Sequence, residues 1–146
     1  MFNKGLGGAV FLPKLAAIPN VKEPDYIVVA YGTNDWFALE QDALRKNAED
    51  FSQSIRKTYP DTPILVITPL WRFDWEEVKK GGKFFEVVAI VKEAFQGQKN
   101  TVVIDGFDLI PHDKAFFGDL SLHPNGKGFE HYFNNLIKAL PEGFFA

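Results

Sequence analysis

Three short apolar runs, separated by longer stretches with helical spacing, constrain the fold of this chain more than any other feature. The runs cover residues 26–31, 64–67 and 101–104, and β-branched side chains are frequent in each. Short continuous runs of this composition are typical of strands that are buried on both faces, as in a parallel sheet. We therefore predict one strand at each run.

Helical spacing marks the segments between and after these runs. Apolar residues recur at i, i+4, i+7 and i+11, which places them on one face of a helix. The residues with this spacing are Leu44, Ala48, Phe51 and Ile55; Phe84, Val88, Val91 and Phe95; and, in the last segment, Phe129, Phe133, Leu136 and Leu140. Strands that alternate with helices predict an α/β protein with a parallel sheet covered by helices. We interpret residues 1–146 as a single domain.

Composition excludes several classes of protein. Aromatic residues make up 15% of the chain, which argues against disorder, and the absence of cysteine excludes a disulfide-stapled scaffold. No apolar run approaches the roughly 20 residues that span a bilayer. A net charge of −3 without a basic cluster argues against nucleic-acid binding.

We expect neither a metal site nor a cofactor, because the three histidines are scattered and no phosphate-binding loop is present. The composition fits either the cytosol or the exterior, and we favour the cytoplasm.

Polar residues follow the carboxyl end of each predicted strand. Residues 32–36 follow the first strand, residues 68–75 the second, and residues 105–108 the third, with a further loop at 119–125. In open α/β sheets ligands bind at the carboxyl ends of the strands. We therefore expect the side chains of these loops to meet at one rim of the sheet.

Two residues at this rim suit catalysis. The amide of Asn34 can donate to an anion, and His123 can act as a general base if a carboxylate such as Asp119 orients its ring. Each has a plainer interpretation. Gly32 to Asp35 could be a simple turn, and His123 could be a surface residue before the last helix.

Four motifs in order resemble the SGNH (GDSL-type) hydrolase family. They are Asn3-Lys4-Gly5-Leu6-Gly7-Gly8, Gly32-Thr33-Asn34-Asp35, Thr68-Pro69-Leu70-Trp71-Arg72, and a late Asp119 followed by His123-Pro124-Asn125. The resemblance covers nearly the whole chain. It implies a flavodoxin-like, three-layer α/β/α fold. It also implies the hydrolysis of small-molecule esters, namely acyl or acetyl esters, and these include esters on carbohydrate.

The resemblance also implies roles for individual residues. His123 would move the proton, Asp119 would orient its ring, and Asn34 and the Gly8 N–H would donate to the oxyanion. Trp36, Trp71 and Arg72 lie near the rim and are candidates for substrate binding. The alternatives are packing of the two indoles against the sheet and a structural ion pair for Arg72.

Two departures from the family pattern matter. The family usually places the aspartate three residues before the histidine, whereas Asp119 lies four before His123, so Asp113 is an alternative orienting residue. The Gly-Asp-Ser block of the family is absent, and none of Ser52, Ser54 and Ser121 takes its place. We therefore expect a domain that is incomplete at its N-terminus and lacks its first βα unit.

An incomplete sheet has a consequence for association. The strand at 26–31 would lie beside a gap, and an unpaired apolar edge tends to pair with another chain. We expect a homodimer or a partner that completes the sheet. A non-catalytic binding module derived from such a hydrolase is the alternative function. A receiver-like domain is disfavoured, because the run at 26–31 ends in Gly-Thr-Asn-Asp and not in an acidic cluster.

Overall fold

A three-stranded parallel sheet forms the centre of the molecule. The structure, a computed structural model, describes residues 3–144. The strands are β1 (Ile27–Val29), β2 (Ile64–Ile67) and β5 (Thr101–Ile104), in the order β1-β2-β5. Val28 is paired with Leu65, and Leu65 with Val102. The prediction of a parallel α/β sheet from the three apolar runs is confirmed.

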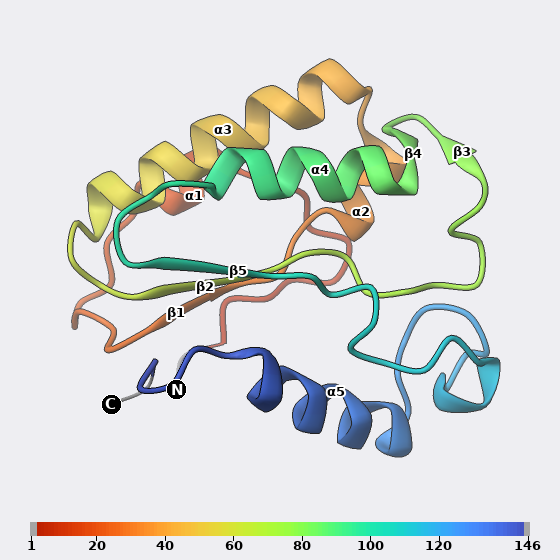
Figure 1. Cartoon of the computed structure of the whole chain (residues 1–146). Coiled ribbons are helices and arrows are strands. Elements are labelled where there is room, and N and C mark those ends of the chain that lie inside the picture. Colours follow the sequence, from red (N-terminus) through yellow and green to blue (C-terminus); the bar gives the residue numbers. More distant parts are fainter. Residues whose placement is uncertain (1–2, 145–146) are drawn as a thin grey trace.

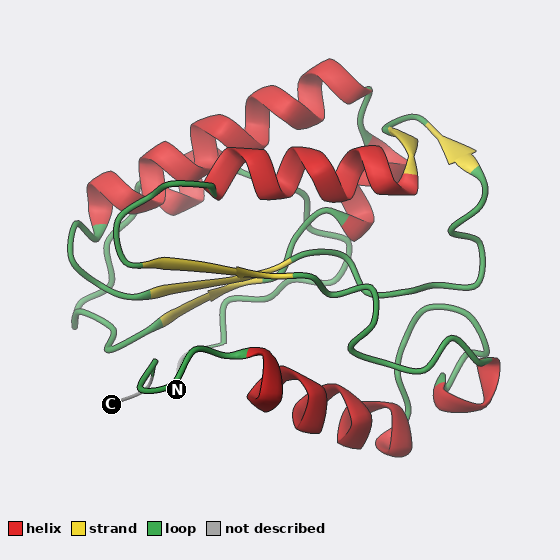
Figure 2. Cartoon of the chain, in the orientation of Figure 1, coloured by secondary structure: helices red, strands yellow, loops and turns green. Residues whose placement is uncertain are grey.

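Helices cover both faces of this sheet (Figures 1 and 2). On one face lie α1 (Pro13–Ala16), α3 (Gln41–Thr58) and α4 (Phe84–Phe95); on the other lies α5 (Gly126–Ala139). Within residues 3–144, none of the helices has the length and apolar character that a membrane span requires.

Several short elements were not predicted from the sequence. They are α2 (Thr33–Ala38), the hairpin of β3 (Val78–Lys79) and β4 (Gly82–Lys83), and the 3₁₀-helix η1 (Lys114–Phe116). Each has six residues or fewer, which is too short for hydrophobic periodicity to mark. They lie beyond the carboxyl ends of the strands and build the rim of the sheet (Figure 1).

The strands divide the core into two layers. Ile64 and Val66 of β2 face α3 and α4, whereas Leu65 and Ile67 face α5. The predicted apolar faces of α3 and α4 are buried as expected. Two predictions of burial are wrong. Val28 of β1 is 59% exposed, and Phe129 and Phe133 of α5 are exposed as well. The position of β1 at an edge of the described sheet agrees with the expectation for the strand at 26–31. The face of α5 that packs on the sheet carries Tyr132 and Leu136, and Leu140, the C-cap residue, packs in the same cluster.

The carboxyl ends of β2 and β5 approach each other closely at Gly106. A Cβ atom on Gly106 would lie 2.0 Å from the carbonyl oxygen of Thr68, so no larger residue fits without movement of the backbone. The Gly106 N–H donates to Oγ1 of Thr68 at 2.9 Å. This contact holds together the start of the two loops that lead to the candidate site.

Candidate active site

The loop before α5 presents His123 on a carboxylate scaffold. Oδ2 of Asp119 lies 2.5 Å from Nδ1 of His123. Oδ1 of Asp119 accepts the backbone N–H groups of Ser121, Leu122 and His123 at 2.9, 2.7 and 3.0 Å. Leu120 adopts a left-handed conformation with φ 59°. The four-residue spacing between Asp119 and His123 therefore allows the two side chains to meet.

The electrostatics of this pair favour a carboxylate and a defined imidazole tautomer. Backbone hydrogen bonds, the largest from Leu122, together with the His123 ring, hold the pKa of Asp119 well below its usual value. An ionised carboxylate accepts the proton of Nδ1, which leaves Nε2 with its lone pair. The His123 side chain is 78% exposed, and within residues 3–144 its Nε2 has no hydrogen-bond partner. This nitrogen is therefore accessible to a nucleophile or a substrate.

Neighbouring elements fix the position of the loop. The Gly118 N–H donates to the carbonyl of His123 at 2.7 Å, and the Phe73 N–H donates to the carbonyl of Ser121 at 3.1 Å. Asn125 accepts the N–H of Gly128 at 3.0 Å and so caps α5. The loop is thereby joined both to the segment after β2 and to the last helix.

Asn34 and Gly8 lie on adjoining segments. Nδ2 of Asn34 donates to the carbonyl of Ala9 at 3.0 Å. Gly8 has φ 76° in a turn that is closed by the Ala9 N–H donating to the carbonyl of Leu6 at 3.1 Å. In the part of the chain that the structure describes, the Gly8 N–H has no acceptor. The amide of Asn34 and the N–H of Gly8 are thus brought into the same region of the rim.

Asp35 holds this arrangement together, and the sequence reasoning gave it no role. Its carboxylate is fully buried and accepts the N–H of Phe11 at 2.8 Å and the N–H of Gly32 at 3.0 Å. Burial raises the pKa of Asp35, while these two backbone hydrogen bonds oppose the rise. The sequence carries a signal for this role, because an acidic residue three positions after a helix cap is typical of a capping box.

The two tryptophans proposed to bind substrate are packed into the core. Trp36 has no exposed surface, and its Nε1 donates to the carbonyl of Gly82 at 2.8 Å. Trp71 is 6% exposed and stacks on His112, with ring centroids 5.5 Å apart and an interplanar angle of 9°. Neither indole offers a face to a ligand in this structure, which agrees with the packing interpretation of both.

Arg72 makes a structural ion pair. Its Nε and Nη2 atoms donate to the two carboxylate oxygens of Asp74 at 2.5 and 3.0 Å. Its guanidinium lies over the ring of Trp36, 5.0 Å from the centroid. Burial disfavours ionisation of Asp74, but hydrogen bonds from Arg72 and Lys79 outweigh it and lower the pKa of that carboxyl. One edge of the guanidinium is thus engaged by Asp74, and one face lies against Trp36.

The carboxylate beside His123 is that of Asp119 and not that of Asp113, the alternative orienting residue. Asp113 caps η1 by accepting the N–H of Ala115 at 2.9 Å, and Asp119 is the carboxylate that contacts His123. Within residues 3–144, no group of three or more His, Asp or Glu side chains could hold a metal ion.

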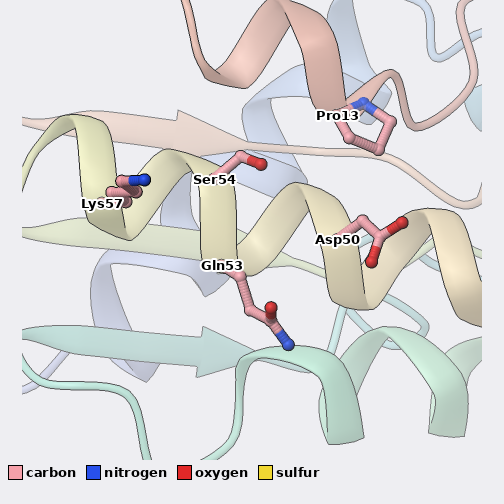
Figure 3. Close-up of a pocket in the computed structure, with 5 residues that line it drawn as sticks. All are labelled: Pro13, Asp50, Gln53, Ser54 and Lys57. Atoms are coloured by element: carbon pink, nitrogen blue, oxygen red, sulfur yellow. The ribbon is translucent and has the colours of Figure 1, made fainter.

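Two of the three serines lie on α3, and the third lies in the loop before α5. Ser52 is buried on α3 and donates to the carbonyl of Glu49. Ser54 lies on α3, where it lines a shallow hollow between α1 and α3 (Figure 3); the other lining residues are Pro13, Asp50, Gln53 and Lys57. Ser121 belongs to the His123 loop itself. Among the described residues, no serine hydroxyl is hydrogen-bonded to His123.

A sequence model of the GDSL-like lipase/acylhydrolase family matches residues 2–131. The chain belongs to this family. No curated protein matches it significantly.

Solved structures share the fold of this GDSL-like family member. A salicylyl-acyltransferase from a tetracycline biosynthetic pathway superposes with a TM-score of 0.68 and 20% identity, over 88% of this chain and 40% of its own. A protein of Lactobacillus plantarum gives 0.66 and 18%, over 86% of this chain and 69% of its own. A carbohydrate esterase of family 3 from Talaromyces cellulolyticus gives 0.56 and 18%, over 81% of this chain and 61% of its own. The chain therefore spans about two fifths of the acyltransferase.

Proposed function

We propose that this chain contributes the proton-transfer and oxyanion-binding groups of an SGNH-type ester hydrolase that acts on acyl or acetyl esters, those on carbohydrate included. The observation that carries the proposal is the Asp119–His123 pair, at 2.5 Å, with Nε2 of the imidazole open to solvent. A histidine whose ring is oriented by a carboxylate in this way acts as the general base of a serine-hydrolase triad.

The proposed chemistry assigns each proton. Nε2 of His123 takes the proton of a serine hydroxyl as its oxygen attacks the ester carbonyl carbon. The carboxylate of Asp119 stabilises the resulting imidazolium through Nδ1–H. When the tetrahedral intermediate collapses, the bond to the alcohol breaks and Nε2 gives the proton to the leaving oxygen, which leaves the acyl group on the serine. Water, deprotonated by the same imidazole, then attacks the acyl group, and the serine recovers its proton as the acid leaves.

Asn34 and Gly8 support the developing charge in this proposal. An Asn amide has two N–H groups, and only one of them donates to Ala9. The second N–H and the Gly8 N–H are both available to a carbonyl oxygen that becomes negative. Loss of one such donor typically lowers the rate by about 10²–10³-fold.

The nucleophile is the part of the triad that this chain does not supply in our proposal. Ser52 is buried on α3, Ser54 lies on α3 as well, and Ser121 belongs to the His123 loop itself. A segment that pairs with the free edge of β1 would bring a serine to the carboxyl end of the sheet, where His123 lies. Among residues 3–144 no serine is hydrogen-bonded to His123, which supports the second candidate, a non-catalytic module that binds a carboxylate or an acetylated sugar.

Binding of acetate tests the site independently of the nucleophile. Acetate carries the oxygens of the ester product, so titration followed by ¹⁵N–¹H NMR should shift the Gly8 N–H and the Asn34 side-chain amide. Asn34→Ala should abolish saturable binding. Shifts spread evenly over the surface, unchanged in Asn34→Ala, would contradict an oxyanion site.

Hydrolysis of p-nitrophenyl acetate separates the two candidate functions. The isolated chain should hydrolyse it no faster than His123→Ala. The longest in-frame product of the natural gene should be measured beside it. Turnover that requires His123 supports the hydrolase, whereas acetate binding without turnover supports the binding module. Hydrolysis by the wild type that survives His123→Ala would eliminate the assigned mechanism.

A further inference from the structure

One buried carboxylate contacts both segments that carry the proposed oxyanion donors. Oδ1 of Asp35 accepts the N–H of Phe11 at 2.8 Å, and Oδ2 accepts the N–H of Gly32 at 3.0 Å. Phe11 lies three residues after Gly8, and Gly32 lies two residues before Asn34. Each oxygen of the carboxylate thus holds the segment of a different donor.

A third hydrogen bond joins the same two segments. Nδ2 of Asn34 donates to the carbonyl of Ala9, two residues before Phe11, at 3.0 Å. Asn34 and Asp35 are neighbours in the chain, so the first turn of α2 is joined to residues 9–11 at two points, once as a donor and once as an acceptor. The Asn34 amide therefore keeps its orientation only while residues 9–11 stay in place.

The two backbone positions that Asp35 joins are themselves fixed by packing. The side chain of Phe11 has no exposed surface and stacks on the ring of Tyr31, with centroids 5.0 Å apart. Gly32 lies against the segment after β2, because a Cβ atom there would be 2.8 Å from Cγ of Pro69. The Asp35 carboxylate thus connects the donor segments to the core as well as to each other.

The burial of Asp35 is costly if its role is only structural. Its side chain has no exposed surface, and within residues 3–144 it forms no ion pair with Lys, Arg or His. A buried charge without a cationic partner is expensive, and proteins retain such groups at functional sites. A helix cap needs only the local contact with Gly32, whereas Phe11 is 24 positions away. The distant contact indicates a role beyond capping.

We propose that Asp35 is a positioning residue of the oxyanion pocket, which fixes the Gly8 N–H and the Asn34 amide relative to each other. It acts through these groups and does not touch the substrate, because it is fully buried. The inference rests on the proposed function, in which both groups donate to the oxyanion. Stabilisation of this kind depends on donors that are in place before the charge develops.

Asp35→Asn tests the positioning role, because an amide has one acceptor oxygen and can hold one of the two segments but not both. In ¹⁵N–¹H NMR spectra the side-chain amide of Asn34 should exchange with solvent roughly tenfold faster than in the wild type, the factor that corresponds to one hydrogen bond. The acetate Kd should rise by roughly the same factor. The ring ¹⁵N shifts of His123 should not change, whereas a general loss of structure would alter them.

Glu86→Gln is the matched control. Glu86 makes the same local capping contact on α4, where it accepts the N–H of Lys83 at 2.6 Å, and among the described residues it accepts from no distant segment. This variant should leave the exchange of the Asn34 amide and the acetate Kd unchanged. Equal effects of Asp35→Asn and Glu86→Gln on the Asn34 amide would reduce Asp35 to a helix cap and overturn the proposal.

The result separates this inference from the proposed function. A wild-type chain that does not bind acetate would count against the oxyanion assignment, yet faster exchange of the Asn34 amide in Asp35→Asn would still support the positioning role. An Asn34 amide that is unchanged in Asp35→Asn would overturn the positioning role, whether or not acetate binds.

Hydrogen exchange of the wild-type chain keeps the test decisive if Asp35→Asn does not fold. The N–H groups of Phe11 and Gly32 should be protected to the same extent, because one buried carboxylate accepts both and the two contacts should open together. A Phe11 N–H that is less protected than the Gly32 N–H by roughly tenfold or more would show that the segments move independently, and would overturn the proposal.

Discussion

Asp119 and His123 meet through side chains that are four positions apart, with Oδ2 of the carboxylate 2.5 Å from Nδ1 of the imidazole. The contact depends on the loop between them. Three consecutive N–H groups point to Oδ1 of Asp119, and Leu120 takes a left-handed backbone conformation that few non-glycine residues adopt. The same carboxylate thus folds the loop and orients the ring.

Replacement of Asp119 by Asn should change the pH dependence of stability. The pKa of Asp119 is lowered in the folded state, so its ionised form stabilises the fold above about pH 4, and this contribution is lost as the pH falls. Thermal denaturation of Asp119→Asn should show a lower Tm than the wild type at pH 7. The difference should shrink between pH 4 and pH 2. Asp25→Asn, at an exposed carboxylate, is the control, and a difference for Asp119→Asn that is constant with pH would contradict the assignment.

Removal of the Asp35 carboxylate should destabilise the fold strongly. Asp35→Ala leaves the buried N–H groups of Phe11 and Gly32 without acceptors, at a cost of about 2–4 kcal/mol in the free energy of unfolding. Asp35→Asn keeps one acceptor and should cost about half as much. Urea denaturation measures both. Asp50→Ala breaks an exposed ion pair with Lys46 on α3 and should stay within about 0.5 kcal/mol of the wild type. Equal values for Asp35→Ala and Asp50→Ala would refute this role of Asp35.

Two glycines at the start of α5 should respond oppositely to alanine. A Cβ atom at Gly128 would lie 2.2 Å from the carbonyl oxygen of Phe116, so Gly128→Ala should cost about 2 kcal/mol or more. A Cβ atom at Gly126 meets nothing within 4 Å, so Gly126→Ala should be neutral or stabilise the helix by up to about 0.5 kcal/mol. Chemical denaturation of the two variants in parallel makes the comparison. Similar stabilities would show that α5 is not seated against η1 as described.

Arg72 should affect stability and not ligand binding. Arg72→Met leaves the partly buried carboxylate of Asp74 with Lys79 as its remaining cationic partner, and we expect a loss of about 1–3 kcal/mol. The same variant should bind acetate as the wild type does. The checks are a denaturation curve and the NMR titration described above. Unchanged stability with weakened binding would restore Arg72 as a substrate-binding residue.

Strands and helices were predicted correctly from the sequence where the residues that form an apolar pattern are also buried in the fold. The runs at 64–67 and 101–104 became β2 and β5, and the spacing of Leu44 to Ile55 marked the buried face of α3. The pattern failed at Val28 and Phe133, because hydrophobicity indicates that a residue can be buried but not whether a neighbour is present to bury it.

For the candidate site as well, some features could be predicted from the sequence and others could not. The loops that follow the predicted strands led us to expect Asn34, Asp119 and His123 at the carboxyl rim. The sequence could not show that Trp36 and Trp71 are buried, because residues near a rim can point into the core or out of it. Asp35 escaped notice because the value of a buried acceptor depends on the N–H of Phe11, which is 24 positions away in the chain.

The sequence by itself determined the α/β class, the order of strands and helices, and the residue types available for chemistry, since these follow from local periodicity and composition. Only the tertiary structure decided that the Asp119 carboxylate reaches the His123 ring, that Arg72 is engaged by Asp74, and that Phe133 of α5 and Val28 of β1 stay exposed. Contacts between distant segments depend on how the chain closes on itself in three dimensions, and a linear pattern does not contain that information.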